Sequence, residues 1–155
     1  MIAGFTGTRE TPTDLQLAWL YATLDTGQIT ELHHGACQGA DSAAHHAALD
    51  AGVAVHVWPP TNMKYVDLDC LTGVPAHLVT VHHAMPYLNR NREIVRAGEG
   101  LMALPKHDEQ PEDRALWGGT WYTVDFAERM NKPVIICNPK GVVTQRFPQQ
   151  LGQEI

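Results

Sequence analysis

The sequence predicts an α/β protein with a Rossmann-like parallel sheet of about five strands and helices on both faces. Short apolar segments alternate with helical segments of about ten residues, which is the pattern of parallel βαβ units with right-handed crossovers. The apolar segments are nearly continuous, as strands buried on both faces require. The chain has 155 residues, the size of one ordinary domain. We therefore expect one domain over 1–155, with a core of about 1–138 and a tail over 139–155 that shows no clear period.

Five strands are expected where β-branched and other apolar residues end at glycine, proline or a polar turn. They are segments 2–6, 29–33, 53–58, 101–104 and 134–137. Segment 76–82 is a further candidate, a short strand within the irregular stretch 61–88. That stretch is too long for a plain connector, and we expect it to form a lid over the site.

Four helices are expected between these strands, over segments 14–26, 40–51, 89–97 and 120–130. Thr13 is a candidate cap for the first helix, and Gly27 ends it. The second helix carries alanines at helical spacing and ends at Gly52.

Composition excludes several classes of protein. Eleven Lys and Arg residues against seventeen Asp and Glu residues give a net charge of −6 at pH 7, which argues against nucleic acid as a partner. No apolar run approaches the ~18 residues of a membrane span, and the N-terminus lacks the basic and apolar segments of a secretory signal. The three cysteines, Cys37, Cys70 and Cys137, are scattered and odd in number, which argues against a disulfide framework and suits the reducing cytoplasm.

Three glycine-rich turns are expected at the carboxyl ends of strands, each shortly before a helix. Their candidate ligand-binding residues are Gly7, Thr8 and Arg9 in the first turn, Gly35, Gly39 and Asp41 in the second, and Gly118, Gly119, Thr120 and Thr123 in the third. Glycine lets backbone N–H groups approach an anion closely, and a helix N-terminus adds a partial positive charge of roughly +0.5 e. One such turn is an ordinary β-to-α connection, but three at one sheet edge favour a phosphate or carboxylate site.

A short polar helix brings three arginines, Arg90, Arg92 and Arg96, into seven positions of this acidic chain. Arg90 and Arg92 lie at the helix start, where the helix dipole disfavours cations, so the pattern favours anion binding. The alternative is a surface helix whose charges are satisfied by acidic neighbours such as Glu93. Asn89 and Asn91, beside the arginines, could supply a cap or hydrogen bonds to a base edge.

Two interpretations stay open for Asp41. It caps the alanine-rich helix that follows, or it accepts hydrogen bonds from a ribose or from the neighbouring loop. The aromatic residues around the last glycine turn, Trp117, Trp121 and Tyr122, also have two interpretations: stacking on a ring of the ligand or packing against the sheet.

Three adjacent histidine pairs, at 33–34, 45–46 and 82–83, do not predict a metal site. Adjacent side chains point about 100° apart on a helix and to opposite faces of a strand, so neither geometry chelates. The sequence also lacks HExxH and CxxC motifs, and it indicates no cofactor. Cys37, near a helix start, is a weak candidate nucleophile, whereas Cys137 is expected to be buried in a strand.

Together these motifs resemble the SLOG superfamily. The resemblance covers about residues 1–138, and the motifs that carry it are Gly-x-x-Gly-Thr-Arg at 4–9, Gly-x-x-x-Gly-Ala-Asp at 35–41, Asn-Arg-Asn-Arg-Glu-Ile-Val at 89–95, Gly-Gly-Thr-Trp-x-Thr at 118–123 and Lys-Pro-Val at 132–134. The chain looks like the small DprA-like and DUF2493-like members, which are found in bacteria and their phages. The resemblance implies a Rossmann-like fold that binds nucleotides or nucleotide-derived ligands, and a homo-oligomer is one expectation because such proteins often pair through helices.

The resemblance also extends to the LOG enzymes, which hydrolyse the N-glycosidic bond of a nucleoside monophosphate. Their motif, Pro-Gly-Gly-x-Gly-Thr-x-x-Glu, supplies a catalytic glutamate, and an upstream arginine assists it. In this chain the glutamate position is Thr123, which has no carboxylate, and Asp125 lies about 200° around the helix from it. The candidate catalytic carboxylates are therefore Asp41, Glu93 and Asp125.

Three functions follow from these observations. The first is a binding module that holds a nucleotide-like small molecule between the glycine turns and the arginine-bearing helix. The second is an N-glycosidic bond hydrolase or transferase acting on a nucleoside monophosphate, which needs a carboxylate near the sugar. The third is DprA-like single-stranded DNA binding, which the net charge opposes. The first accounts for every cluster without requiring a general base.

Overall fold

A sheet of seven strands forms the centre of the structure, a computed structural model that describes residues 1–148. The strands are β1 (Ile2–Gly7), β2 (Glu31–His34), β3 (Ala54–Val57), β4 (Val79–Val81), β5 (Gly100–Leu104), β6 (Val134–Cys137) and β7 (Val143–Arg146). They lie in the order β4-β3-β2-β1-β5-β6-β7. All pairs are parallel except β6 and β7, which are antiparallel. The predicted Rossmann-like α/β class is confirmed.

The expected number of about five strands is wrong, because β4 and β7 extend the two edges of the sheet. β4 falls within the candidate segment 76–82. β7 falls in the tail, where its mostly exposed side chains leave no buried face to impose an alternating apolar pattern. A turn with Gly141 at φ +80° returns the chain onto β6. The rest of the tail, 149–155, lies outside the described residues.

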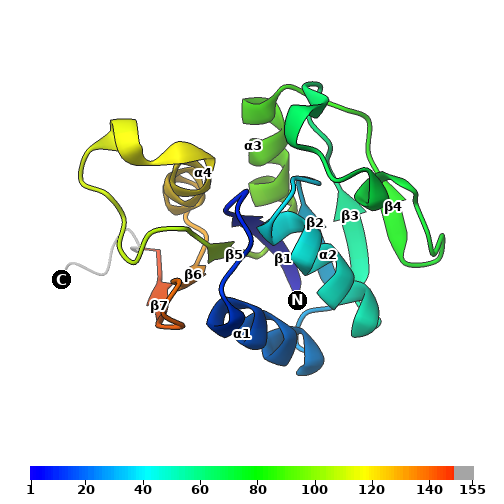
Figure 1. Cartoon of the computed structure of the whole chain (residues 1–155), viewed down its shortest axis with the longest axis horizontal. Helices are drawn as coiled ribbons and strands as arrows, with labels where there is room; N and C mark the ends of the chain where they lie inside the picture. The colour runs from blue at the N-terminus through cyan, green and yellow to red at the C-terminus, as the bar shows by residue number, and fades with distance from the viewer. Residues whose placement is uncertain (149–155) are drawn as a thin grey trace.

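Four helices cover the sheet: α1 (Asp14–Asp25), α2 (Ala40–Asp50), α3 (Tyr87–Ala97) and α4 (Gly118–Arg129). α1 and α2 pack on one face, against side chains such as Phe5 and Leu32. α3 and α4 pack on the other face, against Leu101 and Ala103 (Figure 1). All four expected helices and their distribution over both faces are confirmed. None of the described helices is both long and apolar enough to reach across a membrane.

The position of β1 determines where a ligand site can form. β1 lies between β2 and β5, so the chain builds one half of the sheet outward from β1 and then returns to build the other half. In open α/β sheets the crevice beyond the carboxyl ends of the strands at such a reversal is the usual ligand site. Gly4 lets α3 approach this central strand closely, since a Cβ there would lie 2.9 Å from the carbonyl oxygen of Ile94.

Candidate ligand-binding site

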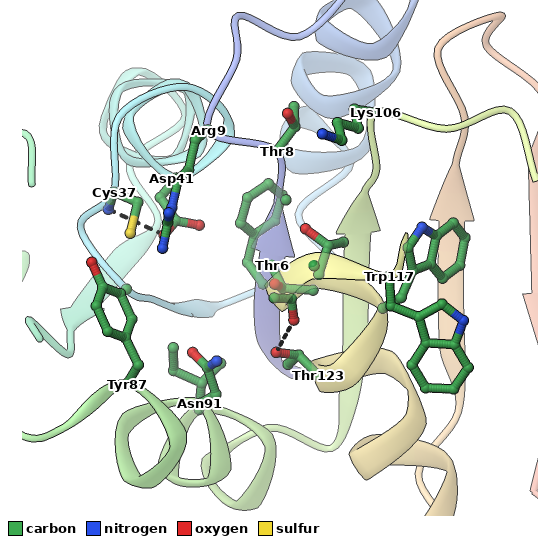
Figure 2. Close-up of a pocket in the computed structure, with 18 of the residues that line it drawn as sticks. Thr6, Thr8, Arg9, Cys37, Asp41, Tyr87, Asn91, Lys106, Trp117 and Thr123 are labelled. Atoms are coloured by element: carbon green, nitrogen blue, oxygen red, sulfur yellow. Dashed lines mark hydrogen bonds between the residues drawn. The ribbon is translucent and has the colours of Figure 1, made fainter. Parts of the chain in front are cut away.

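A cavity of about 270 Å³ lies at the carboxyl ends of β1 and β5, at the reversal of strand order. Five segments line it: the end of β1 with the turn that follows, the turn after β2, the first half of α3, the loop after β5 and the start of α4 with the residue before it. The polar side chains among its lining residues are Thr6, Thr8, Arg9, Glu10, Cys37, Asp41, Tyr87, Arg90, Asn91, Lys106, His107, Thr120 and Thr123. Most of these residues are drawn in Figure 2, with Arg9, Asp41 and Cys37 on one side of the cavity and α4 on the other.

The turn after β1 uses its backbone to join secondary structure elements. The Thr8 N–H donates to the Leu104 carbonyl (2.9 Å), and the Thr8 carbonyl accepts from the Ala40 N–H (2.9 Å). Gly7 has no Cβ because the Ala40 side chain occupies that space. Gly7 and Thr8 line the cavity. The missing Cβ of Gly7 and the hydrogen bonds of Thr8 are nevertheless explained by the packing of α2 against β1.

The turn after β2 is also explained mainly by packing. Gly39 precedes α2 with φ +84° and ψ −121°, and a Cβ there would lie 2.5 Å from backbone atoms of Arg9 and Glu10. Gly39 itself does not line the cavity. At Gly35 a Cβ would collide with the guanidinium of Arg90. The start of α2 therefore faces the first turn, and the expectation that it binds an anion gains no support from the geometry.

The start of α4 is different because it is open. The first N–H groups of a helix have no partner within the helix, and no side chain caps α4. Around Gly118 and Gly119 nothing lies within 4 Å of where a Cβ would be, and both residues line the cavity with Thr120. Of the three predicted turns, this one presents free backbone donors and a helix dipole to the cavity.

Two cations at the cavity lack an acidic partner. Within residues 1–148, neither Arg9 nor Lys106 forms an ion pair. The Arg9 guanidinium lies over the rings of Tyr65 (4.1 Å) and Tyr87 (5.4 Å), which hold it by cation–π attraction. Lys106 was not singled out from the sequence. The one sequence feature that points to Lys106 is its position two residues after β5, a strand that ends at this edge of the sheet.

Arg90 lines the cavity but is a buried structural link. Its Nη1 donates to the carbonyl oxygens of Gly35 and Trp58 (3.1 Å for Trp58), and its Nε donates to Asn91 Oδ1 (2.7 Å). Only 4% of Arg90 is exposed. These bonds tie α3 to the ends of β2 and β3, so its charge is largely committed inside the protein.

The expectation that Arg92 faces the same cavity is wrong. Arg92 lies over the Phe126 ring (5.6 Å) and lines a separate hollow of about 140 Å³ between α3 and α4. Residues two apart on a helix point about 200° apart, so Arg90 and Arg92 cannot share one target. Asn89 is exposed and also lies outside the cavity.

Only one of the three candidate catalytic carboxylates lies in the cavity. Glu93 pairs with Arg96 (3.0 Å) and Asp125 pairs with Arg129 (2.9 Å), both outside it. Asp41 lines the cavity and is buried. The Thr123 hydroxyl donates to the Gly119 carbonyl (2.9 Å), so it serves the helix backbone (Figure 2). A further carboxylate, Glu10, lines the cavity and was missed because it follows the turn motif.

Burial raises the pKa of Asp41 to about 6, and the charges of Arg90 and Arg9 offset only part of that effect. Asp41 Oδ2 accepts a hydrogen bond from the Cys37 N–H (3.2 Å). Asp41 Oδ1 is buried and has no hydrogen-bond partner among the described residues. Desolvation of a charged oxygen without a compensating bond destabilises the folded state.

Asp41→Asn is therefore expected to stabilise the protein in a pH-dependent way. The pKa of Asp41 rises from its ordinary value of 3.8 to about 6 on folding, so between these pH values the folded state binds more protons and loses stability as the pH rises. The free energy of unfolding of the variant should exceed that of the wild type by about 2–3 kcal/mol at pH 8 and by almost nothing at pH 4. Urea denaturation at both pH values measures the difference, and a pH-independent difference would contradict it.

The tryptophans at the third turn belong to the core. Trp117 Nε1 donates to the Pro111 carbonyl (2.6 Å) and Trp121 Nε1 donates to His107 Nδ1 (3.2 Å). Both rings are buried in the layer beneath α3 and α4, although their edges reach the cavity. Tyr122 points away from it and donates to the Arg114 carbonyl (3.2 Å). Of the two interpretations, packing against the sheet fits these contacts.

The pairing of β2 with β3 brings together histidines that are far apart in the sequence. His33 and His56 lie side by side on β2 and β3 with ring centroids 4.4 Å apart, and both contact Glu31. Trp58 Nε1 donates to His33 Nδ1 (2.9 Å), which places the proton on the Nε2 that faces Glu31. A metal-bound imidazole normally donates from its other nitrogen, so hydrogen bonding accounts for this cluster better than an ion does.

A second cluster is fully buried and consists of His34, His45 and Cys70. His34 Nδ1 accepts from the Ala36 N–H (3.0 Å), and its Nε2 lies 2.9 Å from His45 Nδ1. The hydrogen bonds of His34 therefore account for this cluster too, as those of His33 do for the first.

All three cysteines are free. Burial together with the charge of Asp41 raises the pKa of the Cys37 thiol, which disfavours a nucleophilic role.

Comparison with known proteins gives the fold an independent reference. No family model and no curated protein matches this chain. Among solved structures it is similar to a molybdenum cofactor binding protein from the phototrophic bacterium Rippkaea orientalis, with 24% identity and a TM-score of 0.63 over 88% of this chain and 76% of that one. It is also similar to the structural-genomics target TM1055, with 16% identity and a TM-score of 0.59 over 86% and 72% of the two chains.

A third similar structure is DNA processing protein A from Helicobacter pylori, described for its single-stranded DNA binding mode. The identity is 16% and the TM-score 0.60, over 98% of this chain and 67% of that one. At these identities the similarity establishes the fold alone.

Proposed function

We propose that the cavity binds a nucleotide or nucleotide-derived ligand and holds its phosphate at the start of α4. The observation that carries this proposal is the uncapped helix start at Gly118 and Gly119, which opens into a cavity that is also lined by two cations without acidic partners within residues 1–148, Arg9 and Lys106. Backbone N–H donors, a helix dipole and nearby cations together form a phosphate site.

A nucleotide fits the cavity better than a bare anion does. Its volume of about 270 Å³ is near the lower end of the ~300–1,000 Å³ range of small-molecule sites. The half-buried ring of Tyr87 also lines it, and an aromatic ring suits a sugar or base rather than an ion. The similar structures include a cofactor-binding protein and a protein that binds single-stranded DNA, a phosphate-bearing polymer.

Lys106→Ala is expected to weaken nucleotide binding about 10-fold, since one charge-assisted contact to phosphate is lost. Its stability should not change, because Lys106 is exposed. The measurement is isothermal titration calorimetry with a panel of nucleoside mono-, di- and triphosphates and with inorganic phosphate. Lys140→Ala is the matched control, because Lys140 pairs with Asp108 away from the cavity. Absence of binding to the whole panel, or equal affinities for wild type and Lys106→Ala, would contradict the proposal.

N-glycosidic bond cleavage is the second candidate, and the position of Asp41 favours it. The oxocarbenium-like transition state of that reaction needs a carboxylate beside the sugar, and Asp41 is the one earlier candidate that lines the cavity. Release of free base from nucleoside monophosphates, lost in Asp41→Asn, would establish this activity. Stabilisation by the same nucleotides without base release would leave binding as the function. A gel shift at low ionic strength tests the third hypothesis, single-stranded DNA binding.

A further inference from the structure

The two oxygens of Asp41 are used differently. Oδ2 accepts from the Cys37 N–H (3.2 Å). Oδ1 is buried and has no hydrogen-bond partner within residues 1–148. Asp41 as a whole is 7% exposed, and it lines the cavity. Buried polar atoms are nearly always hydrogen-bonded, so this oxygen lacks a partner that something outside the protein can supply.

The two arginine side chains near Asp41 make contacts of their own. The hydrogen bonds of Arg90 go to Gly35, Trp58, Asn91 and the sulfur of Cys37. The guanidinium of Arg9 lies over the Tyr65 ring. The side chain does not cap its own helix either, since no side-chain bond caps α2. The capping interpretation of Asp41 is therefore not supported, and the Asp41 side chain lines the cavity that the ligand would occupy.

We propose that Asp41 Oδ1 accepts a hydrogen bond from a ribose hydroxyl of the ligand, so that the site prefers ribonucleotides to deoxyribonucleotides. This inference rests on the proposed nucleotide binding and names the part of the ligand that a second contact recognises. With the phosphate at α4, Asp41 lies on the opposite side of the cavity, as Figure 2 shows. The sugar then lies between the two contacts.

The number of free oxygens favours a hydroxyl over a base edge. A carboxylate that recognises a base edge typically uses both oxygens on two neighbouring N–H groups. Asp41 has one oxygen left, which matches one O–H donor. A site built to bond a hydroxyl also rejects the analogue that lacks it, because the acceptor is then buried without a partner.

The test compares the affinity of the wild type for four ribonucleoside 5′-monophosphates with that for their 2′-deoxy and 3′-deoxy counterparts by calorimetry. We expect one of the two deoxy series to bind about 10- to 100-fold more weakly, which is the effect of one hydrogen bond to a charged group. In Asp41→Asn that preference should fall to less than about 3-fold. Asp50→Asn is the matched control, an exposed aspartate on the same helix that should keep the wild-type preference.

The outcomes separate this inference from the proposed function. Equal binding of ribo and deoxy forms, or a preference that survives Asp41→Asn, overturns the role of Asp41 and leaves nucleotide binding standing. A change in preference among bases rather than sugars overturns it as well, since Asp41 would then bond a base edge. No binding of any nucleotide overturns both. The wild-type comparison needs no variant, so the test does not depend on the folding of Asp41→Asn.

Discussion

Gly39→Ala is expected to lower the free energy of unfolding by about 3–5 kcal/mol. Gly39 has φ +84° and ψ −121°, a backbone conformation nearly exclusive to glycine that costs other residues about 1–3 kcal/mol. Its Cβ would also lie 2.5 Å from the backbone of Arg9 and Glu10, and overpacking of this kind adds about 1–3 kcal/mol. Urea denaturation followed by circular dichroism measures the change.

Gly27→Ala is the matched control for this prediction. Gly27 also has a positive φ, +77°, but nothing lies within 4 Å of where its Cβ would be. Only the backbone strain is then added, so the expected cost is about 1 kcal/mol. Equal destabilisation by the two substitutions would show that the contact between the turns after β1 and β2 is not tight, and the packing explanation of Gly39 would be wrong.

Arg90→Met is expected to destabilise the protein by about 3 kcal/mol or more. Methionine keeps much of the side-chain volume but leaves the buried carbonyls of Gly35 and Trp58 without their donor, and each such loss costs about 1–3 kcal/mol. Arg92→Met, two residues away at an exposed position, should cost less than about 1 kcal/mol. Thermal and urea denaturation of both variants measure the difference.

Ligand binding by the same two variants distinguishes structure from recognition. We expect Arg92→Met to bind nucleotides as the wild type does, because Arg92 lies outside the cavity. If Arg90→Met stayed stable while its nucleotide affinity fell 10-fold, Arg90 would be a ligand-binding residue. The conclusion that Arg90 mainly links α3 to the ends of β2 and β3 would then be contradicted.

Burial decides which elements the sequence reveals. β5 has every residue buried and α2 buries six of its eleven residues, so apolar runs and helical spacing identify both. β7 buries none of its residues, and its pairing depends on the turn and on β6, which no local pattern records. The stretch 61–88, expected as a lid, contributes β4 to the sheet edge, and Tyr87 near its end lines the cavity.

Glycine motifs reveal the site only in part, because packing and ligand binding select glycine for the same reason. Gly7 and Gly39 are needed where two turns touch, whereas Gly119 faces open space. The sequence cannot separate these cases, since the neighbouring atom comes from a distant segment. Lys106 is not predicted for the same reason: a single lysine in a charged loop has no characteristic spacing, and only the fold brings it to the cavity. Arg92 differs from these cases, because helical spacing alone separates its direction from that of Arg90.

Backbone amide shifts in a nitrogen-15 NMR titration test the central claim most directly. Addition of a nucleoside monophosphate, or of inorganic phosphate as the minimal probe, should move the N–H resonances of Gly118, Gly119 and Thr120 at the open start of α4. The N–H of Ala40 already donates to Thr8, so it should move little. Large shifts at the start of α2 with none at α4 would show that the anion binds elsewhere and would contradict the account.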